Sequence, residues 1–183
     1  AIARISAFEA VGLAGLAWAF AKLEVRDAPL LAATAASAIS LISACGSQEL
    51  SNIVWSFATR PMQDCPLLHS IASASIPIIT DFRTQELSNT AWSYAKLRFP
   101  PLPLMDAIAA SALRRISDAG PQDLANTAWA FASLVLLHLP LLSAISAKAM
   151  PTCEFRSQEI ANPAWSFATL VLWNRPLLEA LSA

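Results

Sequence analysis

Residues 47–58 read SQELSNIVWSFA, and near-copies of this stretch recur along the chain. The copies read TQELSNTAWSYA at residues 84–95, PQDLANTAWAFA at 121–132 and SQEIANPAWSFA at 157–168, with a weaker match, AVGLAGLAWAFA, at 10–21. One tryptophan marks each copy, at spacings of 37, 37, 37 and 36 residues: Trp18, Trp55, Trp92, Trp129 and Trp165. A set of prolines keeps the same spacings: Pro29, Pro66, Pro103, Pro140 and Pro176. Self-similarity at a fixed period is typical of repeat architectures, so the chain contains five copies of one unit.

The repeated stretch has the pattern of an amphipathic helix of about 12 residues. Leu50, Val54 and Phe57 recur at helical spacing and mark one apolar face. We expect the repeated tryptophan to fill the core as well, because a tryptophan in an apolar helical register is usually buried. Trp173 lies outside this register, so it is the one tryptophan that we consider for ligand contact.

The start of this helix carries its own signals. Ser47, Thr84 and Ser157 are predicted N-cap residues, because a hydroxyl oxygen can accept a free backbone N–H of the first turn. Pro121 can begin the same helix, since its φ is already set for the first turn. An acidic residue follows two positions later, as Glu49 does, where it favours the positive end of the helix dipole.

A second helix begins in each unit at the repeated proline, which is tolerated in a first turn because its missing N–H is not needed there. A stretch rich in alanine and serine follows, as in residues 107–112, and small side chains allow neighbouring helices to approach closely. Pro77 and Pro151 fall 11 residues after the opening proline of their units, so we expect the second helix to stop or kink there.

The sequence therefore predicts an all-α protein, a right-handed α-α solenoid of about five helix-pair repeats with a period of about 37 residues. One helix pair cannot bury its apolar faces alone, so neighbouring pairs must stack around a continuous core. We assign residues 1–183 to a single array: a partial repeat at 1–8, then repeats at roughly 9–46, 47–83, 84–120 and 121–156, and the incomplete 157–183. Because the chain begins and ends within a repeat, we expect it to be part of a longer array.

The composition of the chain restricts its function. Charged residues make up 14% and the net charge is -1, against about 25% charged residues in ordinary domains. The low charge suggests that much of the surface contacts something other than water, and it argues against a strong polyanion binder. The three cysteines show no metal or disulfide spacing, and no apolar run is long enough for a transmembrane segment.

Catalytic motifs are missing from the sequence. His69 and His138 are isolated, and no nucleophile elbow, phosphate-binding glycine loop or zinc-protease motif occurs. We therefore expect a non-catalytic protein with no cofactor and no metal.

A ladder of polar positions follows the first helices at i, i+3, i+7 and i+10, beginning at Glu49, Glu86, Asp123 and Glu159, with a degenerate version at Gly12, Gly15, Ala19 and Lys22. Such a ladder can present one set of hydrogen-bonding groups per repeat, as helical-repeat RNA readers do. The candidate ligand-facing residues are Asn52, Ser56, Thr59, Asn89, Ser93, Lys96, Asn126, Ser133, Asn162, Ser166 and Thr169. The alternative is that the asparagines tether a neighbouring loop and that the rest form a solvated face.

The stretch 124–132, LANTAWAFA, preceded by Pro121-Gln122-Asp123, resembles the octotricopeptide repeat of organellar helical-repeat proteins. Residues 48–52, 85–89 and 158–162 repeat the same motif, so the resemblance covers nearly the whole chain. The resemblance implies an α-solenoid that binds single-stranded RNA in chloroplasts or mitochondria. The first unit departs from the motif, with Val11 and Gly15 in place of its glutamine and asparagine.

Two functions remain open at this point. The resemblance favours a non-catalytic module that binds single-stranded RNA in an organelle, either soluble or peripheral to a membrane. The alternative is a structural protein–protein scaffold subunit of a large organellar assembly, such as a ribosome or photosynthetic complex. The weakly charged surface favours the scaffold, because large exposed apolar patches usually mark interfaces. The predicted partners are therefore single-stranded RNA or neighbouring proteins of a large complex.

Overall fold

The computed structural model describes residues 8–25, 27–60 and 62–149, and within these ranges all the regular structure is helical. The elements are α1 (Ala10–Lys22), α2 (Ala28–Ser40), η2 (Ile42–Ala44), α3 (Ser47–Thr59), α4 (Cys65–Ser75), η3 (Ile76–Asp81), α5 (Thr84–Lys96), α6 (Leu102–Arg114), α7 (Pro121–Ser133) and α8 (Leu139–Ala149). The predicted all-α class is confirmed. The fifth repeat, including Trp165 and Trp173, lies outside the described residues.

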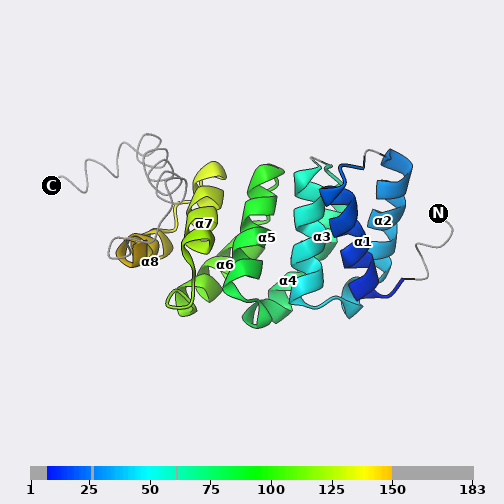
Figure 1. Cartoon of the computed structure of the whole chain (residues 1–183). Coiled ribbons are helices and arrows are strands. Elements are labelled where there is room, and N and C mark those ends of the chain that lie inside the picture. The colour runs from blue at the N-terminus through cyan, green and yellow to red at the C-terminus, as the bar shows by residue number, and fades with distance from the viewer. Residues whose placement is uncertain (1–7, 26, 61, 150–183) are drawn as a thin grey trace.

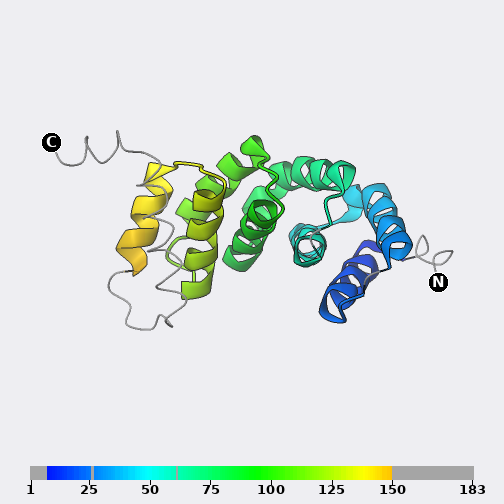
Figure 2. The ribbon, with the colours of Figure 1, turned by 90° about the horizontal axis from the view of Figure 1, so that it is seen from above.

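The helix pairs stack in chain order. The first helices of the units, α1, α3, α5 and α7, lie side by side in one row (Figure 1). The second helices form another row, in which α2 packs on α4, α4 on α6 and α6 on α8. Figure 2 shows that the stack curves, with α1, α3 and α5 on the inner side and α2, α4 and α6 on the outer side. The handedness of the array and its extent over residues 1–183 remain predictions.

The first helices begin one residue earlier than predicted. Gly46, Arg83 and Gly120 are the N-cap residues, and Ser47 and Thr84 are the first helical residues, so their predicted N-cap role is wrong. The reason is that the acid three residues after the cap accepts a hydrogen bond from the N-cap N–H. The N–H to carboxylate distances are 3.0 Å for Gly46–Glu49, 2.9 Å for Arg83–Glu86 and 3.3 Å for Gly120–Asp123. Ser157 lies outside the described residues, and Pro121 begins α7 as predicted.

The first helices end in a repeated turn with a left-handed residue. Glu24, Arg98 and Val135 are at equivalent positions and have φ values of 56°, 51° and 56°. After α5, Phe99 N–H donates to the Tyr94 carbonyl and Arg98 N–H to the Ala95 carbonyl, each at 3.0 Å. These two bonds form a Schellman cap, which usually has glycine in the left-handed position. Glu24, Arg98 and Val135 therefore occupy a backbone position that glycine usually takes in such a cap.

Two of the second helices, α2 and α4, are capped by an aspartate. Asp27 and Asp64 accept N–H bonds from Leu30 and Leu67 at the starts of α2 and α4, both at 3.0 Å. Helix α4 ends at Ser75, before the proline-containing η3. The predicted stop at Pro77 is confirmed, since a proline inside a helix removes a backbone donor.

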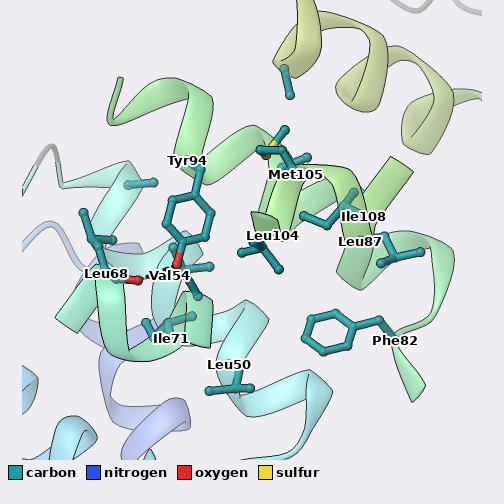
Figure 3. Packing of buried hydrophobic residues seen from close by; sticks show 14 of the residues in the cluster. Leu50, Val54, Leu68, Ile71, Phe82, Leu87, Tyr94, Leu104, Met105 and Ile108 are labelled. Atoms are coloured by element: carbon teal, nitrogen blue, oxygen red, sulfur yellow. Dashed lines mark hydrogen bonds between the residues drawn. The ribbon is translucent and has the colours of Figure 1, made fainter. Parts of the chain in front are cut away.

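The core lies between the two rows of helices. Leu50, Val54 and Phe57 are buried in it, so the predicted apolar face of the first helix is confirmed. Figure 3 shows Leu50 and Val54 within this core. Tyr94 is fully buried, and its hydroxyl donates to the Leu68 carbonyl of α4 at 2.8 Å. Burial raises the pKa of Tyr94 above its ordinary value, because the interior disfavours the phenolate. This bond joins the two rows of helices.

No helix within the described ranges is long and apolar enough to span a bilayer.

Candidate functional site

Each first helix leaves one narrow stripe accessible on the inner side of the stack. In α3 the accessible stripe holds Gln48, Asn52, Trp55 and Thr59, whereas the residues on either side of it are mostly buried. Neighbouring first helices cover both flanks of α3, and α4 packs on it from the other row. The ligand-accessible surface of α3 is therefore limited to this stripe.

The same four positions are accessible in all four described units, and we call this surface the inner ladder. Its columns are Val11, Gln48, Gln85 and Gln122; Gly15, Asn52, Asn89 and Asn126; Trp18, Trp55, Trp92 and Trp129; and Lys22, Thr59, Lys96 and Ser133. Every one of these residues is exposed or half-buried. The ladder thus combines amide, indole and, in two units, ammonium groups.

None of the four described tryptophans is fully buried. The prediction that they fill the core is wrong for Trp18 and Trp55 and holds only in part for Trp92 and Trp129, which are half-buried and pack against the core. Trp18 is 46% exposed, and the other three are half-buried. In α3, Val54 and Phe57 are buried between neighbouring elements, while Trp55 falls on the accessible stripe. Successive residues of a helix are 100° apart, so the step from Val54 to Trp55 is enough to move a side chain from core to surface.

The indole rings and the two lysines form two groups: Lys22 with Trp18 and Trp55, and Lys96 with Trp92 and Trp129. The Trp92 and Trp129 ring centroids lie 6.3 Å apart, and the rings are tilted by 36°. The Lys22 ammonium lies 5.6 Å from the Trp18 centroid and 5.4 Å from the Trp55 centroid, and Lys96 lies 4.6 Å from Trp92. Cation–π attraction therefore places positive charge against the indole faces.

The asparagines predicted to face a ligand are on the inner ladder. Asn52, Asn89 and Asn126 are half-buried. In the described part of the chain their side-chain amides make no hydrogen bond, so no tether to a neighbouring loop is seen there. Each amide can both donate and accept, which leaves the column able to bind polar groups of a ligand.

Two of the predicted serines are in the wrong place. Ser56 and Ser93 are buried, and their hydroxyls donate to the Asn52 and Asn89 carbonyls one turn earlier, at 2.7 and 2.6 Å. They face the packed flank of their helices, where a small side chain fits between close neighbours. The prediction that they face a ligand is therefore wrong.

The last column of the ladder contains the other predicted residues. Lys96 is exposed, and Thr59 and Ser133 are half-buried. The Thr59 hydroxyl donates to the Ser56 carbonyl at 2.9 Å, and the Ser133 hydroxyl is buried with no hydrogen-bond partner among the described residues. The remaining candidates, Asn162, Ser166 and Thr169, lie outside the described residues.

A groove of about 760 Å³ runs between the C-terminal ends of α5 and α7. Its lining includes Trp92, Trp129, Lys96 and Arg98, and it contains no carboxylate. Arg98 lies in a turn beyond the repeated helical motif, so the repeat pattern does not mark it as a candidate. The signal that could have found it is its position two residues after the lysine column.

A second groove, of about 580 Å³, lies at the C-terminal ends of α1 and α3 and is also lined by Ala28 and Leu31 of α2. Glu24 occupies the position equivalent to Arg98, and Thr59 the position equivalent to Ser133. Arg60 also lines this groove, but its guanidinium donates to the Ala21 carbonyl at the end of α1. The two grooves therefore differ in charge, because one contains a lysine and an arginine without a carboxylate and the other contains Glu24.

Other chemically active side chains have local structural roles. His69 Nδ1 lies 2.9 Å from the Cys65 carbonyl oxygen, and His138 Nδ1 accepts from Leu141 N–H at 3.2 Å. Burial, aided by the nearby Glu49 carboxylate, raises the pKa of the Cys45 thiol. Within the described ranges, no group of three His, Cys, Asp or Glu residues is placed to hold a metal ion.

Comparison with known proteins identifies one family. The family model described as RESC6, RNA-editing substrate-binding complex 6 protein, matches residues 1–183, the whole chain. Comparison with individual curated proteins gives no match.

Proposed function

The chain belongs to the RNA-editing substrate-binding complex 6 family, and from this premise we propose that its inner ladder binds single-stranded RNA. The family description places its members in an RNA-editing complex, which is compatible with either an RNA or a protein partner. The resemblance of the repeated motif to octotricopeptide repeats supports the same ligand and remains part of the proposal.

The observation that carries the proposal is the row of four accessible tryptophans in one register. Single-stranded nucleic acid binds to proteins largely by stacking of bases on aromatic side chains, beside positive charges that follow the backbone. The ladder offers indole faces at Trp18, Trp55, Trp92 and Trp129 and free amides one turn away. Lys22 and Lys96 supply the positive charges.

Each class of side chain has a distinct role in this proposal. The indoles stack on bases, the asparagine amides bond base edges or sugar hydroxyls, and the lysines contact phosphates. The asparagine column is uniform in the second to fourth units, so it contributes affinity rather than discrimination. Selectivity between bases falls to Thr59 and Ser133, the members of the variable fourth column that are not lysines.

We also propose that the protein is non-catalytic and acts in the mitochondrion. The absence of catalytic motifs from the sequence supports the first part. Of the two organelles that the sequence leaves open, the link to RNA editing favours the mitochondrion. Fluorescence microscopy of the tagged full-length protein tests the location, and a chloroplast signal would contradict it.

The test of RNA binding is fluorescence anisotropy of a labelled single-stranded oligonucleotide titrated with the protein over a range of salt concentrations. Contacts with three or four phosphates predict a log–log salt slope of about -2 to -3, at roughly 0.7 per phosphate. Trp55→Leu and Trp92→Leu should each weaken binding about 5- to 150-fold, from roughly 1–3 kcal/mol of stacking per base. Leu102→Ala, on the outer row and 53% exposed, is the matched control and should bind normally.

The absence of binding at low salt would contradict this function. Equal weakening by Leu102→Ala and by the tryptophan variants would show that lost folding, and not lost stacking, explains the result. Thermal melting of each variant separates these two explanations.

A scaffold role in the same complex is the second candidate, and exposed apolar side chains favour it. Val11 and Leu23 are 70% and 75% exposed, and Leu102, Val135 and Leu139 are each about half exposed. Crosslinking in organelle extract distinguishes the two functions. Protein crosslinks at these residues with no RNA adduct on the inner ladder would favour the scaffold.

A further inference from the structure

The groove between α5 and α7 differs from the rest of the inner ladder in combining two indoles with two positive charges. Trp92, Trp129, Lys96 and Arg98 all line it, together with apolar and small residues and no carboxylate. We propose that this groove is the phosphate-anchoring nucleotide subsite of the protein, in which one base stacks on Trp129 and its phosphate binds Lys96 and Arg98. The inference rests on the proposed RNA-binding function and places the strongest phosphate contact in the groove between α5 and α7.

The stacking position is assigned to Trp129 because, among the described tryptophans, it is the one with no lysine over its ring. Lys96 lies over the Trp92 ring, and Lys22 lies against both Trp18 and Trp55. At the corresponding position of α7 the residue is Ser133, and within the described ranges no cation lies over Trp129. A base can therefore approach Trp129 without displacing a lysine.

The phosphate position is assigned to Lys96 and Arg98 because both are exposed and both are held in place. Contact with Trp92 at 4.6 Å positions the Lys96 ammonium. Arg98 is fixed at its Cα by the two hydrogen bonds of the helix cap, at a φ of 51°. A guanidinium can bind two phosphate oxygens at once, which an ammonium cannot do with the same geometry.

The groove between α1 and α3 provides an internal comparison. It places Glu24 where the other groove has Arg98, and its one arginine, Arg60, already donates to a backbone carbonyl. A carboxylate at this point repels a phosphate, so the first groove is a poor phosphate site. The RNA backbone should therefore be held most tightly at the α5–α7 end of the described stack.

The left-handed backbone of Arg98 allows a test that separates binding from folding. Glycine adopts a positive φ without the steric cost of an ordinary residue, so Arg98→Gly removes the charge without straining the turn. Its melting temperature should be unchanged or higher. The charge-matched control is Arg83→Ala, at the exposed opposite end of α5, about 20 Å away at 1.5 Å per residue.

The experiment measures anisotropy of fluorescein-labelled octauridylate against the full chain and its variants, at several salt concentrations. Arg98→Gly should raise Kd about three- to tenfold and reduce the salt slope by about 0.7, as expected for one lost phosphate contact. Trp129→Leu should raise Kd without changing the slope. Arg83→Ala should change neither quantity.

Glu24→Arg is the gain-of-function variant, because Arg98 shows that an arginine fits the same left-handed turn. It should lower Kd and increase the slope by about 0.7, by creating a second basic groove. If the parent protein binds octauridylate but Arg98→Gly binds with the same Kd and slope, the subsite is refuted and the general RNA-binding function stands. If the parent protein does not bind at low salt, both are refuted.

Discussion

Replacing Tyr94 with phenylalanine removes one hydroxyl from the interior, and its consequence for stability can be worked out at two pH values. At pH 7 the variant loses the 2.8 Å hydrogen bond to the Leu68 carbonyl. A buried neutral hydrogen bond contributes about 0.5–1.5 kcal/mol net. Since Leu68 lies inside α4, its carbonyl keeps a helical partner, so we expect a loss of about 1 kcal/mol.

The effect should reverse at high pH. The pKa of Tyr94 in the folded protein is raised above the unfolded value of about 10, so above pH 10 the unfolded chain releases a proton that the folded chain retains. The stability associated with the neutral hydroxyl is present below pH 10 and is lost as pH rises. At pH 11 the loss is about 1.4 kcal/mol, which exceeds the hydrogen-bond gain. The parent protein and Tyr94→Phe should therefore be equally stable near pH 10.7, with the variant more stable above it.

The assay is guanidinium unfolding followed by circular dichroism at pH 7, 10 and 11. The chain contains only one tyrosine, so the difference between parent and variant reports on Tyr94 alone. Ser40→Ala is the control, because Ser40 is exposed and bonds only within its own helix turn. A constant difference between parent and Tyr94→Phe at all three pH values would refute the reasoning, since it would mean that the folded phenol ionises as freely as the unfolded one.

Three further predictions concern stability and reactivity. Phe131→Ala should destabilise the protein by about 3–5 kcal/mol in the same unfolding assay, because Phe131 is 1% exposed; a loss below about 1 kcal/mol would contradict its placement in the core. Glu86→Ala should cost about 0.5–2 kcal/mol by removing the acceptor for the Arg83 N–H, and Glu86→Gln should recover part of the loss. In a variant with Cys153 replaced by serine, a thiol reagent at pH 8 should label exposed Cys65 rapidly and Cys45 slowly, since Cys45 is buried with a raised pKa; equal rates would contradict this.

The repeat and its helices could be predicted from the sequence because they depend on local patterns. The period of the tryptophans and prolines marks the units, and the spacing of Leu50, Val54 and Phe57 marks the buried face. The break at Pro77 follows from the missing backbone donor. The N-cap assignment at Ser47 was wrong, because Glu49 accepts a hydrogen bond from the Gly46 N–H and the helix begins one residue earlier.

The composition of the site depended on how the helices pack against one another. Ser56 and Trp55 are adjacent in the sequence, and polarity alone suggests that the serine faces solvent. Once α3 lies between α1 and α5, its flanks accept only side chains that fit between close neighbours, so the serine is buried and the large indole stays on the accessible stripe.

The sequence by itself determined the helices, their order and the repetition of one polar and aromatic register, since all of these follow from periodicity within a single unit. Only the tertiary structure decided which stripe of that register stays accessible and which residues of different units meet. Arg98 and Trp129 line one groove although they are 31 residues apart, because stacking of α5 on α7 brings a turn of one unit beside a helix of the next. A contact between units depends on packing geometry, which a repeated local pattern does not contain.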